Sequence, residues 1–544
     1  MEMIDQVEST PGGGIDQSFV LVELFRPLVE RIEFHFVEHS TERITTSRID
    51  RLPEWLLTYV RENFIEGGPW DLVQSGLRTA DNGLPLAFLN ELVRMILWVF
   101  RERNFFRDPQ VCGPRSSPFL LCNAVEQLLQ FDQLLRELSV EATSNSFSEV
   151  RLIGLMDTVV ALDEELMAWW IEREREIVFS TLFDESAVVQ PLVNHVSPRA
   201  EIFCALFRSV QFKAALLSNP GEYQSKVAVP LCIQFIDAIH ETSIELKNFL
   251  TSRRNLPSHA DLIANVNQWI ELVNGTHLAE LVLRRESSWQ DGRPSMSQSD
   301  HDLARFGRSL ERVQTVLVEE FAAAFVETVL MEKARFASYL MMASHLLASQ
   351  EWDGDDSELS AELREANVVL IQFLQACNVA VLTPIRSDSE LDTDELPSEN
   401  QLVAQFAPAT MRNQVMGRLA EKFLEVALDI HSMTPDVWRQ GALIFARDVH
   451  LMMGTCNLPI VLRLLDITKL LSMESNSLFG LKSALGGLVG ASIYLDVNEF
   501  SADGTIYEEA VSMIRAKGLH NLEFEDALSV LNRRRDLPSA YYPE

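Results

Sequence analysis

Apolar positions along most of the chain recur at three- and four-residue steps, the period of an amphipathic helix. In residues 152–170 only Asp163 interrupts the apolar stripe, and in residues 310–340 a second stripe is longer than a mean helix of about 11 to 12 residues. Each segment is predicted to be one long helix with one buried face. The same period predicts helices at 86–100, 119–138, 200–217, 227–249, 259–273, 363–381, 411–430, 434–453 and 459–471.

Strand signals are sparse, because alternating runs of β-branched residues bounded by hairpin turns hardly occur. The dipeptides Asn82-Gly83 and Asn274-Gly275 are typical of hairpin turns, but helix-like segments flank both. The fold class predicted from the sequence is therefore all-α.

Polar segments containing Gly, Pro or runs of acids predict the boundaries between helical parts. Such segments lie at 287–302, 352–359 and 386–400, and Pro11 with three following glycines predicts a flexible leader. The predicted division is a leader at 1–18, then helical bundles at 19–148, 149–300, 301–400 and 401–544.

The C-terminal pattern predicts two short helices. One covers residues 507–516 and stops near Gly518, where a left-handed residue is expected. The next begins after Asn521, carries acidic residues at its start and ends at Arg533, Arg534 and Arg535. Acids at the start and bases at the end complement the helix dipole.

The charge balance excludes several classes of partner. The chain has 544 residues, with 79 acidic against 46 basic residues and a net charge of −33. Nonspecific binding to nucleic acid or anionic lipid requires clustered Lys and Arg, so neither is expected. The first residues are acidic and polar, which predicts no secretory signal and a cytoplasmic chain. The least charged run, 483–495, is shorter than the ~20 residues of a membrane-spanning helix, so no direct membrane insertion is expected.

The six cysteines lie far apart and form no CxxC pair, which favours reduced, buried thiols over a disulfide framework or a zinc site. Asn274-Gly275-Thr276 matches a glycosylation sequon. Without a secretory signal it is interpreted as a chance match.

One motif has the form of a catalytic site. His35-Phe36-Val37-Glu38-His39 reads HxxEH, in which His35 and His39 would bind zinc and Glu38 would act as general base. Three specified positions in five occur readily by chance, so a packed or hydrogen-bonded histidine is favoured. No nucleophile elbow or complete phosphate-binding loop is found. The sequence thus predicts no catalytic, metal or cofactor-binding residues, and a protein that is not an enzyme.

Two aromatic clusters, Phe34-His35-Phe36 and Pro53-Glu54-Trp55, flank a polar segment without Gly or Pro. This HF…PEW arrangement resembles the signature of the RINT-one/TIP-twenty family, called MAIGO-two in plants. The family pattern has Asp-Lys-Pro-Glu-Trp, whereas here one residue is inserted and the Lys is replaced in Asp50-Arg51-Leu52-Pro53-Glu54-Trp55.

Further positions resemble the family in the same order along the chain. They are the segment 126–132 ending in Phe131-Asp132, Trp170 followed by Glu172 and Glu174, the segment 198–201, and the terminal stripe at 524–537. The resemblance therefore extends from about Phe19 to Leu537.

The resemblance implies a tethering subunit of the Dsl/NRZ complex, built as an elongated rod of stacked helical bundles (CATCHR-type). Such a protein is non-catalytic, lies peripherally on the cytosolic face of the endoplasmic reticulum (ER), and binds a Dsl/ZW-ten-like tether subunit and ER SNAREs. Through them it acts indirectly on COPI vesicles in retrograde Golgi-to-ER transport. The alternatives are a helical scaffold or checkpoint protein of the same fold, and a zinc hydrolase using His35, Glu38 and His39.

The six signature residues are expected to be structural. Phe34, Phe36 and Trp55 would anchor the junction of two helical elements. Pro53 suits a helix start and Glu54 its positively polarised first turn.

One departure concerns the N-terminus. The family begins with a helical segment that pairs with the Dsl/ZW-ten-like subunit, whereas this sequence has a short Gly-rich leader before Phe19. Either the gene sequence is truncated or this contact is lost, in which case pairing with that subunit would be impaired.

Overall fold

The structure is a computed structural model of the chain. It describes residues 17–37, 51–66, 68–76, 84–108, 111, 118–143, 154–162, 164–184, 195–217, 220–252, 256–288, 298–346, 361–382, 399–429, 435–454, 456–493 and 504–534.

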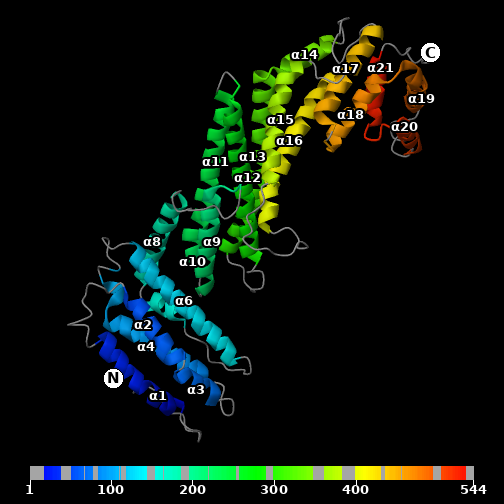
Figure 1. Ribbon diagram of the computed structural model, residues 1–544. Helices are drawn as coiled ribbons and strands as arrows, with labels where there is room; N and C mark the ends of the chain where they lie inside the picture. Colours follow the sequence, from blue (N-terminus) through cyan, green and yellow to red (C-terminus); the bar gives the residue numbers. More distant parts are fainter. Residues whose placement is uncertain are drawn as a thin grey trace. The chain divides into compact units, whose positions relative to one another are not determined.

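Within these residues the only regular elements are helices, which confirms the all-α prediction (Figure 1). The chain divides into two compact units. Unit 1 comprises residues 1–189, 202–236 and 282–306, and unit 2 comprises 190–201, 237–281 and 307–544. The predicted division into four successive bundles is not tested by these two units and stays a prediction.

Helix α4 (Leu84–Glu102) forms the centre of the N-terminal part of unit 1. It contacts α1 (Gln17–Ile32), α2 (Leu52–Val60), α3 (Pro69–Gly76) and α6 (Pro118–Thr143). Its apolar residues are buried against these neighbours, and its exposed face carries Arg94 paired with Glu91. Short helical turns complete this part: η1 (Glu33–Val37), η4 (Arg61–Ile65) and η5 (Phe105–Arg107).

The segment predicted as one helix over 152–170 contains two helices, α7 (Leu155–Leu162) and α8 (Glu164–Leu182). Asp163, which interrupts the stripe, lies outside the described residues. The start of α7 is held by Asp132 of α6, whose carboxylate accepts the backbone N–H groups of Leu155 at 2.6 Å and Met156 at 2.9 Å. A helix begins where its first N–H groups find acceptors, and here a neighbouring helix supplies them.

Four helices supply residues to both units: α9 (Pro198–Leu216), α11 (Val229–Ser252), α12 (His259–Ser288) and α13 (Gln298–Ala323). The turn α10 (Gly221–Tyr223) and the π-helical η7 (Gln224–Ala228) precede α11. Because α12 extends to Ser288 and α13 begins at Gln298, the predicted linker at 287–302 is partly helical at both ends.

The second long stripe, 310–340, is not one helix as predicted. Helix α13 continues into the π-helical η8 (Ala324–Lys333), and α14 (Phe336–Leu346) begins after Arg335. Arg335 adopts φ 58°, a left-handed conformation that ends a right-handed helix. The apolar period continues across this break, so periodicity alone could not locate it.

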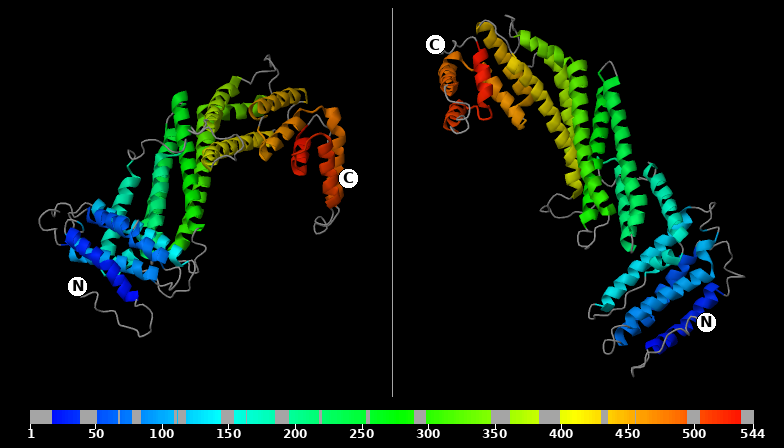
Figure 2. Two further views of the ribbon diagram at one scale, coloured as in Figure 1. Left: turned by 60° about the horizontal axis from the view of Figure 1, so that its bottom comes forward. Right: turned by 180° about the vertical axis from the view of Figure 1, so that it is seen from behind.

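In unit 2, α15 (Ala361–Leu382) packs beside α16 (Glu399–Asp429), and α17 (Pro435–Met453) packs against α18 (Pro459–Ser472) (Figures 1 and 2). Helix α16 begins at Glu399, inside the linker predicted at 386–400. The linker predicted at 352–359 lies outside the described residues.

The last three helices are α19 (Ser475–Ile493), α20 (Gly504–Ala516) and α21 (Phe524–Arg533), and the last two lie close to their predicted positions. Gly518, with φ 73°, ends α20 as expected. Arg534 differs from expectation, because its buried guanidinium donates to the carbonyls of Leu470, Leu471 and Met473 at the end of α18. It therefore satisfies the last carbonyls of another helix and fastens α21 to α18.

One helical stretch of the described residues, Gly221–Ser252, is long and apolar enough to cross a membrane by length and composition. Of its most apolar window, 44% is buried inside the protein, and core helices of soluble proteins pass the same test.

Candidate functional site

The HF…PEW segment lies in the N-terminal part of unit 1. The ring of Phe36 is buried, and its centroid lies 5.6 Å from that of Tyr59 on α2 in an edge-on arrangement. Phe34, which was expected to anchor the junction of two helical elements with Phe36 and Trp55, is instead 46% exposed. In the π-helical turn η1, neighbouring side chains point in different directions, and only one of the two phenylalanines faces the helices.

The PEW half forms a helix start, as predicted. Pro53 is buried in the first turn of α2, where its missing N–H costs no hydrogen bond, and Glu54 is exposed in the same turn. Trp55 is only half-buried, so it is a smaller part of the core than expected.

The zinc hypothesis cannot be followed to its full ligand set, because Glu38 and His39 lie outside the described residues. His35 is exposed, and its ring lies 5.2 Å from that of Phe34 and 5.9 Å from that of Tyr59. Within the part of the chain that the structure describes, no group of three or more His, Cys, Asp or Glu side chains is placed to hold a metal ion.

A buried ion pair lies inside unit 1. Lys213 of α9 donates to Oε1 of Glu174 on α8 at 2.6 Å, and the two side chains are only 8% and 4% exposed. A third charge, Glu126 of α6, lies 3.8 Å from the Lys213 ammonium and is half exposed to solvent. Buried charges persist only when paired, so this contact fixes where α9 lies against α8.

Apolar and weakly polar groups enclose this pair. The rings of Trp170 and Tyr223 are fully buried and stacked, with centroids 4.8 Å apart. Burial, with the nearby Glu174 charge, raises the pKa of both the Tyr223 hydroxyl and the Cys122 thiol far above their usual ranges. Both groups stay neutral, so Cys122 has no thiolate to react with. Trp169, directly before Trp170 on α8, is half exposed.

Four of the five cysteines described, Cys122, Cys204, Cys232 and Cys377, are buried and form no disulfide, as predicted. Burial raises the pKa of Cys232 well above its usual value and that of Cys377 to about 12. Cys456 is partly exposed.

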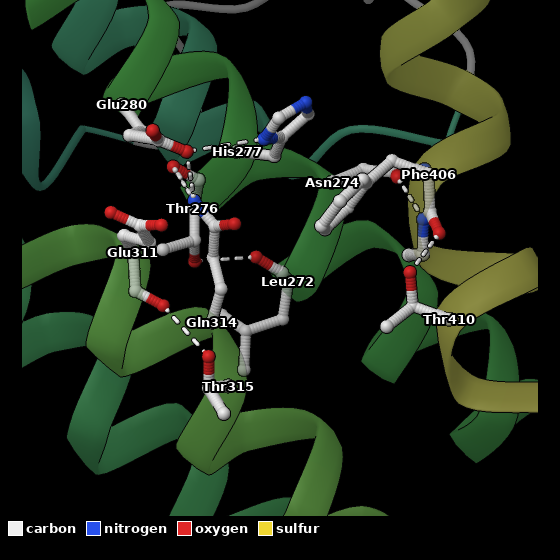
Figure 3. Close-up of polar contacts among 11 residues, drawn as sticks. Leu272, Asn274, Thr276, His277, Glu280, Glu311, Gln314, Thr315, Phe406 and Thr410 are labelled. Atoms are coloured by element: carbon white, nitrogen blue, oxygen red, sulfur yellow. Dashed lines mark hydrogen bonds and ion pairs between the residues drawn. The ribbon is translucent and has the colours of Figure 1, made fainter. Parts of the chain in front are cut away.

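A polar cluster of unit 2 surrounds four consecutive residues of α12, Asn274 to His277, which we call the α12 node (Figure 3). Asn274 is fully buried. Its amide nitrogen donates to the carbonyl of His195 at 3.0 Å, and its amide oxygen accepts the backbone N–H of Ala407 on α16 at 2.9 Å. One side chain thus joins α12 to two segments distant in sequence.

The residue of α16 that contacts Asn274 directly precedes a proline. Pro408 lies inside α16, where it disturbs the hydrogen bonds of the preceding turn. Ala407, directly before it, donates its N–H to Asn274. Thr410 bonds back to the carbonyl of Phe406 at 2.8 Å, so polar groups on both sides of the proline are satisfied.

Gly275 gives α9 room to begin against α12. A Cβ atom at this position would lie 2.7 Å from both the Ala200 Cβ and the Ser197 Oγ. The N–H of Ser197 donates to the carbonyl of Glu271 at 3.1 Å, directly beside this contact. His195, two residues before Ser197, adopts the left-handed φ of 61°. Only glycine allows the two backbones this close.

The last two residues of the node face α13 and α16. Gln314 of α13 donates to Glu280 at 2.8 Å and to the carbonyl of Thr276 at 3.4 Å. His277 Nδ1 lies 3.3 Å from the same Glu280 oxygen. Its ring stacks on Phe406 with centroids 4.0 Å apart. Figure 3 shows Glu280, His277 and Gln314 converging between the helices.

These contacts hold helices together, and they include no nucleophile activated by an adjacent base. Sequence reasoning missed the node because Asn274-Gly275 was considered only as a hairpin signal or part of a sequon. A glycine inside a helical pattern costs about 1 kcal/mol, and that cost could have indicated a close backbone contact. Asn274 and Thr276 are fully buried, in agreement with the interpretation of the sequon as a chance match.

Comparison of the chain with protein-family models, curated proteins and solved structures found no match.

Proposed function

We propose that this chain is a non-catalytic subunit of a vesicle-tethering complex, similar to the RINT-one/TIP-twenty family, that acts in retrograde Golgi-to-ER transport. In this proposal it lies peripherally on the cytosolic face of the ER and binds a Dsl/ZW-ten-like subunit and ER SNAREs. Its helices would form the stacked bundles of a CATCHR-type rod.

The observation that carries the proposal is the ordered set of family-like residues between about Phe19 and Leu537. Several of them make specific contacts. Phe36 packs on Tyr59, Asp132 holds the start of α7, and Glu174 forms the buried ion pair. Residues that place helices against each other are the ones a shared helical architecture would retain.

The all-helical composition of the described residues also supports the proposal, because long amphipathic helices with a buried stripe can pack into extended bundles. The net charge of −33 makes recruitment by anionic lipid alone unfavourable, so membrane association would require specific protein partners.

The test is affinity capture of the full chain from cells of its own organism, followed by mass spectrometry. The proposal predicts enrichment of a Dsl/ZW-ten-like tether subunit and ER SNAREs. Capture of an unrelated assembly without either would contradict it, and would favour the scaffold or checkpoint alternative.

A matched pair of variants sharpens this experiment. Phe34→Ala removes the exposed aromatic ring of the signature, whereas Phe479→Ala removes an exposed ring of α19 outside it. If the signature faces a partner, Phe34→Ala weakens capture of that partner and Phe479→Ala does not. Equal capture with both variants would assign the signature a purely structural role.

A further inference from the structure

The Asn274-Gly275 dipeptide of the α12 node has its own covalent chemistry. In an unfolded chain, the backbone nitrogen of the glycine attacks the side-chain carbon of the asparagine, and ammonia leaves as a five-membered succinimide closes. Water then opens the ring to aspartate or isoaspartate. Glycine favours this reaction because it has no Cβ to shield the attacking nitrogen, and water is the only co-reactant.

The helix prevents this attack. In α12 the backbone at Asn274 is held in helical geometry, which directs the Gly275 nitrogen along the helix and away from the asparagine side chain. The amide is also engaged at both ends, by the His195 carbonyl and by the Ala407 N–H. It cannot turn towards the backbone without losing both hydrogen bonds.

Packing adds a second restraint. The Gly275 backbone is pressed against Ala200 and Ser197 so closely that a Cβ atom would lie 2.7 Å from each. Reorientation of the peptide plane between Asn274 and Gly275 therefore requires the start of α9 to move away. The ring of His277, one turn along α12, stacks on Phe406 and keeps α16 against the same site.

We propose that Asn274 is a latent deamidation site that reacts only when the α12 node opens, and that the reaction then prevents the node from closing. This proposal rests on the chemistry and packing of the node and is independent of the proposed tethering function.

The second half of the proposal follows from the products. Aspartate at position 274 would place a carboxylate oxygen against the His195 carbonyl, where the amide N–H now donates. Two acceptors facing each other in a buried site repel and remain unsatisfied. Isoaspartate would add a methylene to the backbone of α12 and shift its helical register. Either product turns a reversible opening into a permanent one.

The experiment follows deamidation of Asn274 in the full chain by peptide mass spectrometry, with a synthetic peptide of residues 270–279 as the unprotected reference. We expect the native chain to react at least about a hundredfold more slowly than the peptide, because the node must first open. Denaturant below the concentration of global unfolding should raise the rate in the chain and leave the peptide rate nearly constant. Equal rates in native chain and peptide would overturn the proposal.

A matched pair of variants tests whether the node controls the rate. Phe406→Ala removes the ring beneath His277 and should accelerate deamidation at least about tenfold, which corresponds to about 1.4 kcal/mol. Phe479→Ala, which removes an exposed ring elsewhere in unit 2, should leave the rate unchanged. If Phe406→Ala does not fold, the denaturant series on the unchanged chain gives the same test.

Asn274→Asp tests the consequence for the node. Hydrogen exchange of the backbone amides of residues 272–278 and 405–409 should accelerate at least about tenfold in this variant. Protection equal to that of the unchanged chain would show that the product still allows the node to close, and would overturn the second half of the proposal.

Discussion

Two buried polar clusters, the Glu174–Lys213 ion pair of unit 1 and the α12 node of unit 2, hold helices together with different chemistry. In unit 1 the central contact is between full charges, the Glu174 carboxylate and the Lys213 ammonium. In unit 2 the α12 node relies on the amides of Asn274 and Gln314, a glycine contact and backbone hydrogen bonds. Removal of either partner of the ion pair leaves a buried charge unpaired. The α12 node instead distributes its contacts over several smaller interactions.

The chemistry of these contacts also determines which of them can be recognised from the sequence. A charge that belongs to a buried helix face stands out, and Glu174 and Asp132 both belong to family-like segments. Asparagine and threonine inside a helical pattern do not stand out, because they also occur on solvated faces. The Glu174–Lys213 ion pair is therefore easier to recognise from the sequence than the individually weaker contacts of the α12 node.

The largest expected effect comes from breaking the ion pair on one side. Lys213→Met leaves the Glu174 carboxylate buried and unpaired, and should lower the stability of α8 and α9 by about 3 to 5 kcal/mol. Hydrogen exchange of these helices measures their local free energy of opening. A local measurement is needed because a chain with two units has no single free energy of unfolding. The control is Lys226→Met, since Lys226 pairs with Glu222 at the surface and should contribute about 0.5 kcal/mol or less.

A smaller loss is expected at the start of α7. Asp132→Ala removes the acceptor for two buried N–H groups and should destabilise α7 by about 2 kcal/mol. Asp132→Asn keeps one acceptor oxygen and should lose less. Faster exchange of the Leu155 and Met156 amides in Asp132→Ala is the diagnostic observation, and unchanged protection there would refute the capping role.

In unit 2 the corresponding test uses glycine. Gly275→Ala gains about 1 kcal/mol of helix propensity, but the added Cβ clashes with Ala200 and Ser197. Overpacking costs about 1 to 3 kcal/mol, so we expect a net loss of roughly 1 kcal/mol for the node. Gly417→Ala in α16, where a Cβ meets no atom within 4 Å, should instead stabilise the unit by about 0.5 to 1 kcal/mol. Opposite signs in thermal unfolding would confirm the close contact, and stabilisation by both would exclude it.

Helical periodicity predicted the fold class and most helix positions, because a buried stripe recurs wherever a helix packs on one side. It did not predict the break at Arg335, since the apolar period continues across that segment. The end of α20 at Gly518 was predictable because a single residue type favours a left-handed φ.

The contacts between helices were less predictable. Phe34 and Phe36 are identical residues two positions apart, yet only Phe36 is buried, since the π-helical turn η1 sets their directions. Arg534 was interpreted as a complement to its own helix dipole, whereas it binds the carbonyls of α18. Such partners are distant in sequence, and no local pattern identifies them.

The most direct test of the claim that the ion pair fixes α9 against α8 is a double-mutant cycle at Glu174 and Lys213, measured by hydrogen exchange of α8 and α9. Glu174→Leu and Lys213→Met should each be strongly destabilising, and the double variant should recover most of the loss, with a coupling energy of about 2 kcal/mol or more. If the two losses simply add, the two charges act independently, and the ion pair does not determine how α9 packs against α8.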